Sequence, residues 1–381
     1  MIYFDNAATG GRKPYAVQRA VRAATEGCCG NPGRSGHALA LALAQDVLRT
    51  RRLLARFFNA PDPERVIFTQ NCTHALNLAI HGLCAQKRGT SPEIHVVSTV
   101  AEHNSVLRPL FALERQGKIS LTLVQAERGV VSPRDIAAAV RENTVAAVFT
   151  LASNVTGMTI DPAAVRALLP DGVLTICDGA QACGHIPVDL RGAGIDALAV
   201  AGHKGMCGIQ GSGALLLSER FSPPPLLYGG TGSESANPDM PLFYPDRLEA
   251  GTISCPAAAS LAEGVLHLLP RQEKIAAHLK KLTGVLVNGL KEIEGIAVYS
   301  RPNPCGIAAF ACDNLQSEFF AQRLSDEYDI AVRGGLHCAP KMHEALGTKE
   351  GLVRASLSEY STRAEAEVFL RAVREISASV R

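Results

Sequence analysis

The chain has 381 residues, of which 47% are hydrophobic and 19% are charged, and its formal net charge is +2. A chain of this length and composition can bury extensive apolar cores and is expected to form roughly two or three domains. The small net charge and the lack of any long lysine or arginine run exclude the electrostatic footprint of a protein that binds nucleic acid or an anionic membrane. We therefore expect a small or weakly charged partner.

The amino-terminal sequence from Met1 to Thr9 has no basic segment leading into a long apolar stretch, and no apolar run approaches the length that spans a bilayer. We therefore expect a cytoplasmic protein. Eleven cysteines are present, an odd number in a long chain. Because most lie in apolar surroundings, we interpret them as buried thiols rather than a disulfide framework. The close pairs Cys28-Cys29 and His337-Cys338 lack the Cys-x-x-Cys spacing of a zinc site, so no metal is expected.

The first two thirds of the chain alternate short β-rich apolar runs with helical patterns. Strands are predicted at 66–69, 94–98, 120–124, 145–151, 173–177, 197–200 and 214–217. Helix starts are predicted at Ser132-Pro133 and Asp161-Pro162, where a capping side chain precedes a proline at the first helical position. This alternation predicts an α/β fold with a mainly parallel sheet covered by helices on both faces.

The pattern changes after a loop rich in proline and glycine at 222–245. Apolar residues recur every three or four positions from Ile275 to Ile293, which predicts one long amphipathic helix. Thr362 and Glu365 form a capping box that opens a later helix, and strands are predicted at 297–299, 307–311 and 352–357. We expect a smaller carboxy-terminal α+β domain, with an amino-terminal segment packing against it and boundaries at 1–13, 14–255 and 256–381.

Lys204 and Asp178 carry the strongest chemical signal. Lys204 lies in Ala-Gly-His-Lys-Gly after the apolar run 197–200, and Asp178 follows the apolar run 173–177. An enzyme that uses pyridoxal 5'-phosphate requires an amine that forms a Schiff base with the cofactor aldehyde, and a buried carboxylate that keeps the pyridine nitrogen protonated. Taken singly, the lysine could be a solvated surface residue and the aspartate a helix N-cap. Together at successive strand ends, they favour the cofactor.

Polar side chains follow the other predicted strands, and ligands of doubly wound sheets collect at the carboxyl ends of strands. Thr73 lies at a helix start that could hold a phosphate, His103 offers an imidazole that could stack on a flat ring, and Asn154 could bind a phenolic oxygen. Gln181 and His203 complete the set. Each residue has a simpler alternative: helix caps for Thr73 and Asn154, a surface imidazole for His103, and a turn for Gln181.

Eight segments in order along the chain resemble the class V aminotransferase family of fold type I. The similarity runs from Ile2 to about Glu367 and is closest to the cysteine desulfurase and selenocysteine lyase branch. The segments are Phe4-Asp-Asn-Ala-Ala-Thr, Glu102-His-Asn-Ser, Ser153-Asn-Val-Thr-Gly, Asp178-Gly-Ala-Gln, Gly202-His-Lys-Gly, Leu248-Glu-Ala-Gly-Thr, His337-Cys-Ala-Pro and Val353-Arg-Ala-Ser.

The resemblance implies a role for each matching residue. Lys204 is expected to carry pyridoxal 5'-phosphate, Asp178 to pair with the pyridine nitrogen, and His103 to stack on the ring. The remaining cofactor contacts implied are Asn154 and Gln181 at the phenolic oxygen, Cys72, Thr73 and His203 around the phosphate, and Thr252 reaching the cofactor of the other subunit in a homodimer. Arg354, Arg333 and Asn154 are implied to bind the substrate, because a planar guanidinium suits a carboxylate.

The resemblance also implies that Cys338 is the nucleophile that removes sulfur from L-cysteine, leaving L-alanine and a persulfide on Cys338 for a possible acceptor protein. His337 would favour the thiolate if it were protonated, and Gly334 and Gly335 would permit a mobile loop. Composition alone favours the simpler interpretation of Cys338 as one more inert thiol, and only its match to the family loop favours a nucleophile.

Two other readings stay open. The chain could use the same cofactor for another class V reaction, as a selenocysteine lyase, an aminotransferase, an epimerase or a β-lyase, or it could be a noncatalytic scaffold of the same fold. The retained Lys204 argues against a scaffold. The sequence also departs from the family pattern, with Ala201 in place of a hydroxyl residue, Ile209 in place of a proline, His74 in place of a glutamate, and Cys72 in place of a small or hydroxyl residue.

Overall fold

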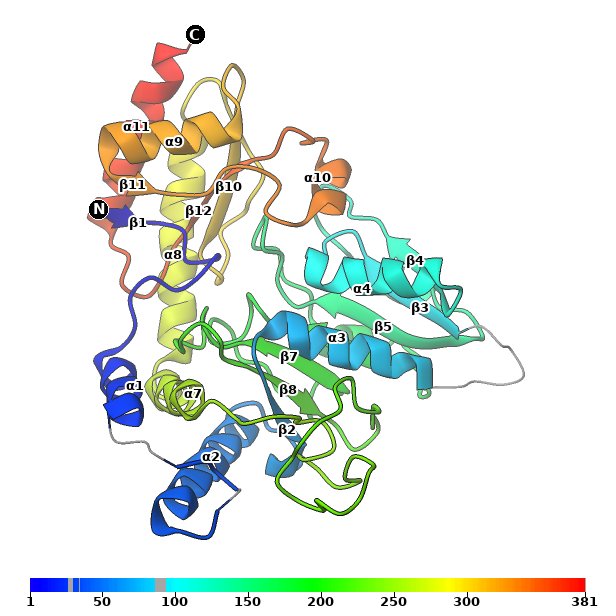
Figure 1. Ribbon diagram of the computed structural model, residues 1–381. Coiled ribbons are helices and arrows are strands. Elements are labelled where there is room, and N and C mark those ends of the chain that lie inside the picture. The colour runs from blue at the N-terminus through cyan, green and yellow to red at the C-terminus, as the bar shows by residue number, and fades with distance from the viewer. Residues whose placement is uncertain (27–29, 34, 86–93, 381) are drawn as a thin grey trace.

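The computed structural model describes residues 1–26, 30–33, 35–85 and 94–380, so the pair Cys28-Cys29 lies outside the described residues. Its central feature is a seven-stranded sheet with the strand order β2-β8-β7-β6-β5-β3-β4 (Figure 1). The strands are β2 (Val66–Thr69), β3 (Ile94–Thr99), β4 (Ile119–Val124), β5 (Thr144–Thr150), β6 (Leu174–Asp178), β7 (Ala197–Ala201) and β8 (Gly213–Leu217).

All seven strands lie where the sequence predicts them, and the expected mainly parallel sheet is confirmed. Strands β4, β3, β5, β6 and β7 pair in parallel, whereas β8 runs antiparallel to both of its neighbours, β7 and β2. In the register, Thr150 of β5 lies opposite Asp178 of β6, and Asp178 lies opposite Ala199 of β7. The carboxyl ends of these three strands are therefore level with one another.

Apolar cores cover both faces of this sheet, because successive side chains of a strand point to opposite faces. Ala197 and Ala199 of β7 belong to one core, and Leu198 and Val200 to the other. The first core lies under α3 (Cys72–Gly82) and α4 (Asn104–Arg115), which run across the same face in Figure 1. The opposite face is covered by α2 (Ala38–Phe57), α5 (Pro133–Ala138), α6 (Pro162–Arg166) and α7 (Cys255–Leu268).

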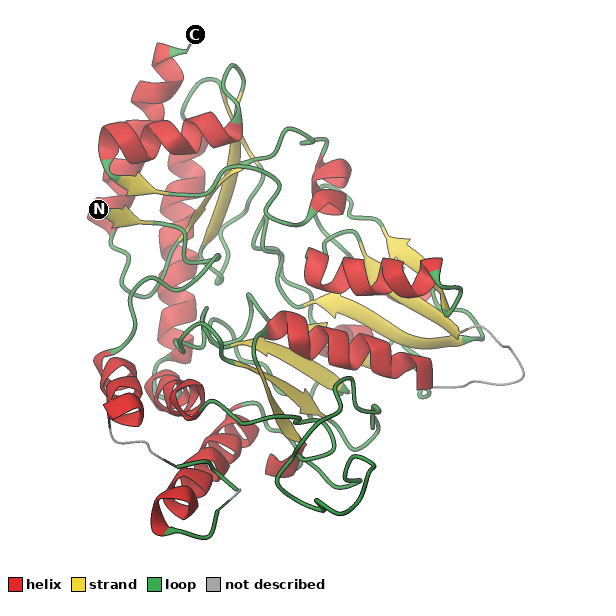
Figure 2. Ribbon diagram, viewed as in Figure 1, coloured by secondary structure: helices red, strands yellow, loops and turns green. Residues whose placement is uncertain are grey.

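A second layer of strands and helices follows α7. Strands β9 (Ile296–Val298), β10 (Ile307–Cys312) and β12 (Val353–Ser356) form an antiparallel sheet in the order β12-β10-β9. Figure 2 shows helices packed beside this small sheet. The helices of this half are α8 (Gln272–Lys291), α9 (Ser317–Tyr328), α10 (Pro340–Leu346) and α11 (Arg363–Ser379).

The amino terminus returns to this carboxy-terminal half of the chain. Strand β1 (Ile2–Tyr3) pairs in parallel with β11 (Ile330–Ala331), and Asp5 forms a bridge with Ser356 at the end of β12. Helix α1 (Tyr15–Glu26) then packs against α7. Three-residue 3-10 turns precede β2 and follow α3 at Pro63–Arg65 and Leu83–Ala85. The division of the chain at residues 13 and 255 stays a prediction.

The predicted helix caps are present. Ser132 and Asp161 accept hydrogen bonds from backbone N–H groups at the starts of α5 and α6, and Thr362 and Glu365 form the expected capping box of α11. The long amphipathic helix is α8, which ends at Lys291, two residues before the last apolar position of its predicted stripe. Among the described residues, no helix is both long and apolar enough to cross a membrane.

Candidate active site

A pocket of about 220 Å³ lies where the carboxyl ends of β5, β6 and β7 meet the amino-terminal ends of α3 and α4. Ten of the twelve predicted site residues line it, although they come from segments spread over most of the chain. These ten are Cys72, Thr73, His103, Asn154, Asp178, Gln181, His203, Lys204, Arg333 and Arg354. The other two, Thr252 and Cys338, do not line this pocket.

Lys204 lies in a tight turn directly after β7. Glycines flank the His203-Lys204 pair because a Cβ on Gly202 would collide with the Ser212 side chain, and one on Gly205 would collide with the backbone of Cys183. Burial lowers the pKa of the Lys204 amine, and the nearby Asp178 carboxylate partly opposes this effect. The turn therefore presents an amine with an increased neutral fraction, the form that attacks an aldehyde.

Asp178 ends β6 with only 3% of its surface exposed. Its Oδ1 atom accepts a hydrogen bond from the Ala180 N–H at 2.9 Å and lies 3.4 Å from the Cys72 Sγ atom. Burial, reinforced by Asp178, raises the pKa of the Cys72 thiol well above its usual range, so the thiol is the hydrogen-bond donor. Both contacts hold the same carboxylate oxygen and fix the orientation of Asp178.

His103 is the N-cap of α4, since its Nδ1 atom accepts the Ser105 N–H at 3.0 Å. Its ring also lines the pocket, so the residue is not the surface imidazole of the simpler interpretation. Burial is the largest influence on this ring and lowers its pKa to about 4. The imidazole is therefore neutral at pH 7, and a neutral planar ring suits stacking better than a charged one beside Lys204.

Helix α3 points its amino-terminal end into the pocket. Asn71 is its N-cap, accepting the His74 N–H at 2.9 Å, so Thr73 is not the cap that the simpler interpretation requires. The Thr73 hydroxyl contacts the Ser105 hydroxyl at 2.8 Å instead. Unpaired N–H groups at a helix start attract anions, and both hydroxyls lie beside this start.

Two residues that the sequence interpretation missed support His203. Its Nδ1 atom lies 3.0 Å from the Thr9 hydroxyl, and its carbonyl oxygen accepts a hydrogen bond from the Lys13 amine at 2.8 Å. Burial lowers the pKa of the His203 ring to about 4, assisted by the charges of Lys204 and Lys13. Thr9 ends the Phe4-Asp-Asn-Ala-Ala-Thr motif, which was the available signal for this contact.

Gln181 and Asn154 face the pocket from two different loops. Gln181 donates from Nε2 to the Ala7 carbonyl at 2.9 Å, and its Oε1 atom is buried without a hydrogen-bond partner among the described residues. Asn154 is 6% exposed and donates from Nδ2 to the His337 carbonyl at 2.7 Å. The buried amide oxygen of Gln181 is thus left to interact with whatever fills the pocket.

Arg354 and Arg333 stand side by side, because their backbones form an isolated antiparallel bridge. The Arg354 side chain is 1% exposed; its guanidinium donates to the Asn154 carbonyl at 2.9 Å and contacts Asp5 Oδ1 at 3.1 Å. Its Nε atom has no hydrogen-bond partner among the described residues. Asp5, which the sequence analysis did not single out, therefore anchors the expected carboxylate-binding arginine.

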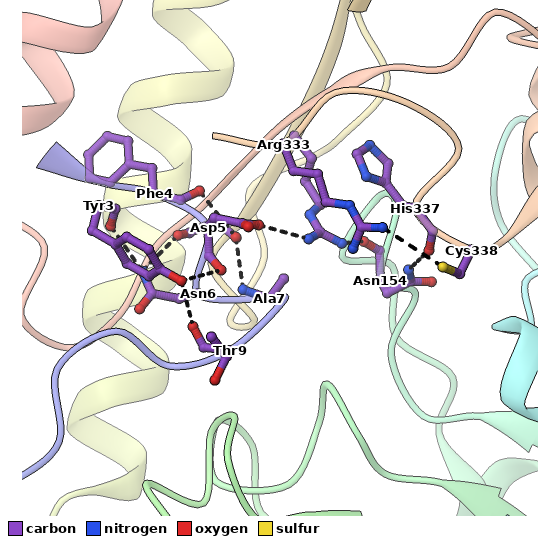
Figure 3. A network of polar contacts seen from close by, with 12 residues as sticks. Tyr3, Phe4, Asp5, Asn6, Ala7, Thr9, Asn154, Arg333, His337 and Cys338 are labelled. Carbon is purple, nitrogen blue, oxygen red and sulfur yellow. Dashed lines mark hydrogen bonds and ion pairs between the residues drawn. The ribbon is translucent and has the colours of Figure 1, made fainter. Parts of the chain in front are cut away.

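Cys338 lies at the rim, one residue beyond the pocket-lining His337, and its Sγ atom is 3.8 Å from Arg333 Nη2. Burial lowers the pKa of His337 to about 2, and its Nε2 atom pairs with the Leu352 carbonyl at 3.0 Å. The suggestion that a protonated His337 favours the thiolate is therefore wrong, because this ring is neutral at pH 7. The positive group beside the thiol is Arg333 (Figure 3).

Gly334 and Gly335, which precede Cys338, are required for close packing. A Cβ on Gly334 would collide with the Ser317 backbone at the start of α9, and Gly335 adopts φ +102° while its N–H donates to the Ser317 hydroxyl at 3.0 Å. Only glycine fits both positions. Close packing thus requires both glycines, and the mobility of this loop stays a prediction.

Glu102, immediately before His103, is a buried acid that the sequence interpretation did not use. It is 0% exposed, and its Oε1 atom accepts hydrogen bonds from the Thr99 hydroxyl at 2.6 Å and the Thr150 N–H at 3.1 Å. Burial raises the pKa of this carboxyl to about 8. Glu102 thus ties the end of β3 to the end of β5 beneath the pocket.

Thr252 lies in a separate depression with Gln70, His74 and Leu227. It therefore contributes nothing to the pocket around Lys204 of its own chain. Within the described part of the chain, no cluster of three or more histidine, cysteine, aspartate or glutamate residues could hold a metal ion.

The family model for class V aminotransferases matches residues 2–369. A protein of Methanothermobacter thermautotrophicus described as a probable cysteine desulfurase is 33% identical, with 99% of this chain and 94% of that protein aligned. The "Cysteine desulfurase IscS" of Neisseria meningitidis is 28% identical, over 93% of this chain and 86% of its own.

Solved structures show the same likeness. The apo structure of a cysteine desulfurase from Thermococcus onnurineus superposes with a TM-score of 0.89 at 29% identity, covering 99% of this chain and 95% of that one. The cysteine desulfurase CsdA from Escherichia coli, in an S-sulfonic acid form, gives 0.87 at 25% identity and covers 100% and 95%. The match to the family model over nearly the whole length shows that this chain belongs to the class V aminotransferase family.

Proposed function

We propose that this chain is a pyridoxal 5'-phosphate-dependent cysteine desulfurase that converts L-cysteine to L-alanine and collects the sulfur on Cys338 as a persulfide. The observation that supports this most is the meeting of Lys204 and Asp178 in one pocket, with the Cys338 segment at its rim. The names of the relatives support the same reaction.

The pocket residues fit this cofactor. The amine of Lys204 suits its aldehyde, the Asp178 carboxylate its pyridine nitrogen, and the neutral ring of His103 its flat face. The start of α3 suits a phosphate, and the unpartnered Gln181 Oε1 atom is a buried acceptor for a protonated phenolic oxygen. When bound, the cofactor supplies an electron sink for the substrate's α-carbon.

The side chains of this protein would then have the following roles in the reaction. Arg354 and Arg333 bind the substrate carboxylate, because paired guanidinium donors match its two oxygens. The buried amine of Lys204 moves the proton at the substrate α-carbon, since its lowered pKa makes it a better acid–base catalyst near pH 7. The Cys338 thiol attacks the substrate sulfur at the rim of the pocket.

The overall reaction needs no external oxidant or reductant. The carbon–sulfur bond of L-cysteine breaks, a sulfur–sulfur bond forms at Cys338, and a proton replaces sulfur on the carbon that becomes the alanine methyl group. L-cysteine plus a thiol therefore becomes L-alanine plus a persulfide.

The first experiment tests the cofactor. Wild-type protein and Lys204→Ala are incubated with pyridoxal 5'-phosphate, dialysed and examined by absorbance and mass spectrometry after borohydride reduction. We expect the wild type to retain a Schiff-base band and a covalent adduct on Lys204 after reduction, and Lys204→Ala to lack both. A wild-type protein that stays colourless after this treatment would remove the cofactor from the proposal and favour a scaffold.

The second experiment tests the nucleophile. Cys338→Ala should lose alanine formation from L-cysteine, whereas Cys312→Ala, which removes another partly exposed thiol, should retain it. Retained turnover of selenocysteine by Cys338→Ala would show that the cofactor chemistry is intact. Unchanged turnover of L-cysteine by Cys338→Ala would remove this residue from the reaction.

We also propose that the chain acts as a homodimer in which Thr252 reaches the cofactor of the other subunit. Thr252 lies away from its own pocket, and the neighbouring loop exposes Leu227, Tyr228 and Leu242 by 50%, 75% and 81%. Coexpressed Lys204→Ala and Thr252→Ala subunits would form mixed dimers with one intact site. Recovery of activity in the mixture, above that of either variant alone, is the expected result; a monomer in sedimentation would contradict it.

We further propose that the protein acts in the cytoplasm and that an acceptor protein takes the persulfide sulfur. Cell fractionation tests the location. Transfer of radioactive sulfur from labelled L-cysteine to a second protein, dependent on Cys338, tests the acceptor.

A further inference from the structure

The segment that carries Cys338 is fastened to the seven-stranded-sheet half of the chain at two successive carbonyl groups. The His337 carbonyl accepts a hydrogen bond from the Asn154 side chain at 2.7 Å, and the Cys338 carbonyl accepts one from the Asn104 backbone N–H, also at 2.7 Å. Figure 3 shows the Asn154 side chain next to His337 and Cys338. The donors come from the loop after β5 and from the start of α4.

The backbone of this segment has an unusual conformation. His337 has φ +49° and Cys338 has φ +57°, so two successive residues with side chains occupy the left-handed region. Such conformations persist only where surrounding contacts hold them in place. The two hydrogen bonds act on the carbonyl groups of these same two residues and are thus placed to hold the conformation.

The Asn104 N–H is available because it belongs to the first residue of α4. The first N–H groups of a helix have no partner within the helix, and here the Cys338 carbonyl satisfies one of them. His103, the cap of the same helix, lines the pocket. The nucleophile segment is therefore docked on the same helix start that holds the expected stacking ring.

Asn154 connects three parts of the site. Its side chain lines the pocket and binds the His337 carbonyl, while its own carbonyl accepts a hydrogen bond from Arg354. The expected carboxylate-binding arginine and the expected nucleophile are thus held by opposite ends of a single residue.

We propose that the Asn154 side-chain amide and the Asn104 backbone N–H are positioning groups. They hold the Cys338 thiol at the rim of the pocket, at a fixed position relative to Arg354. This inference rests on the proposed function only for the role of Cys338 as a nucleophile. The docking itself is a property of the protein without substrate, so it can be tested separately.

The structure offers a matched pair of variants at position 104. Asn104→Pro removes the backbone N–H donor together with the asparagine side chain, and proline is well tolerated as the first residue of a helix. The preceding His103 has φ −71° and ψ 155°, a conformation that a following proline permits. Asn104→Ala also removes the asparagine side chain but keeps the backbone N–H, so it serves as the control.

The readout is the rate at which iodoacetamide alkylates each cysteine in cofactor-free protein, followed by peptide mass spectrometry. We expect iodoacetamide to alkylate Cys338 about five to ten times faster in Asn104→Pro than in Asn104→Ala, as the loss of one hydrogen bond implies. Asn154→Ala should produce a similar rise relative to wild type. Cys177, buried at 0% exposure, reports loss of folding, and the partly exposed Cys312 reports any general change in reactivity.

Equal Cys338 alkylation rates in Asn104→Pro and Asn104→Ala would overturn the proposal. If Asn104→Pro also accelerates the alkylation of Cys177, this variant has lost its fold and Asn154→Ala becomes the test. An unchanged Cys338 alkylation rate in Asn154→Ala would then overturn the proposal. In loaded enzyme, Asn104→Pro should lower kcat for alanine formation about five- to tenfold relative to Asn104→Ala, with little change in KM, because Arg354 is untouched. If Asn104→Pro accelerates Cys338 alkylation but the wild-type protein forms no alanine, the positioning proposal stands and the desulfurase function is rejected.

Discussion

The buried carboxyl of Glu102 makes stability depend on pH in the direction opposite to that of most acidic residues. Its pKa is raised from 4.5 to about 8 because burial disfavours the charged form, and the two hydrogen bonds to Oε1 only partly oppose this. Glu102→Gln keeps an Oε1 acceptor for Thr99 and Thr150 but cannot ionise. The substitution therefore removes the titration while retaining the shape of the site.

The sign follows from proton binding. Between pH 4.5 and about pH 8 the folded chain retains a proton on Glu102 that the unfolded chain releases, so stability from this group is fully present below pH 4.5 and is lost as pH rises toward 8. One proton changes the free energy of unfolding by about 1.4 kcal/mol per pH unit. From about pH 5.5 to about pH 7.5, wild type should thus lose about 3 kcal/mol relative to Glu102→Gln.

The assay is urea unfolding of wild type and Glu102→Gln at several pH values across this window. The stability difference between them should shift by about 3 kcal/mol in favour of the variant as pH rises. Glu367→Gln is the control, because Glu367 pairs with Arg363 on the surface at 2.9 Å and should leave the pH dependence of wild type unchanged. Parallel stability curves for wild type and Glu102→Gln would show that Glu102 is ionised in the folded chain and refute this reasoning.

Cys72→Ala should weaken pyridoxal 5'-phosphate binding to the cofactor-free chain about tenfold in a fluorescence titration, and Cys72→Ser should retain affinity, because a hydroxyl can replace the donor to Asp178; equal affinities would contradict the role of the thiol. Arg51→Met should lower the free energy of unfolding by about 3–5 kcal/mol, since it strands the buried Glu249 carboxylate, whose Oε2 lies 2.5 Å from Arg51. Combining Arg51→Met with Glu249→Leu should recover most of the lost free energy of unfolding, measured by urea unfolding. A double variant no more stable than Arg51→Met would contradict the role of the unpaired Glu249 carboxylate. Arg354→Lys should raise KM for L-cysteine at least about tenfold in steady-state assays, because an ammonium group cannot make the paired contact; an unchanged KM would exclude carboxylate binding by Arg354.

Much of the fold could be predicted because short apolar runs and capping residues are local signals. The caps Ser132, Asp161 and Thr362 act within three residues of their own positions, and each is present in the structure. The direction of β8 could not be predicted in this way. Its five residues are all buried, and a strand buried on both faces has the same composition whether its neighbours are parallel or antiparallel.

The pocket residues could be predicted because they follow strands whose carboxyl ends meet, and because the family motifs mark them. Residues that act through distant partners carried no comparable signal. Asp5 contacts Arg354 across 349 positions of sequence, and Asn154 contacts His337 across 183. The neutral state of His337 was also hidden, since it results from burial by segments that the local sequence does not contain.

The charge of the assembled pocket differs from what its residue types suggest. Burial lowers the pKa of His103 and His203 to about 4 and raises that of Glu102 to about 8, so these rings and this acid are uncharged at pH 7. Arg354 then pairs with Asp5, while Arg333 and Asp178 line the same pocket. Binding a cofactor phosphate and a substrate carboxylate adds negative charge beside the two arginines and the start of α3. A net charge of +2 over the whole chain gives no sign of this arrangement, because the field in a pocket is set by the few groups that remain charged there.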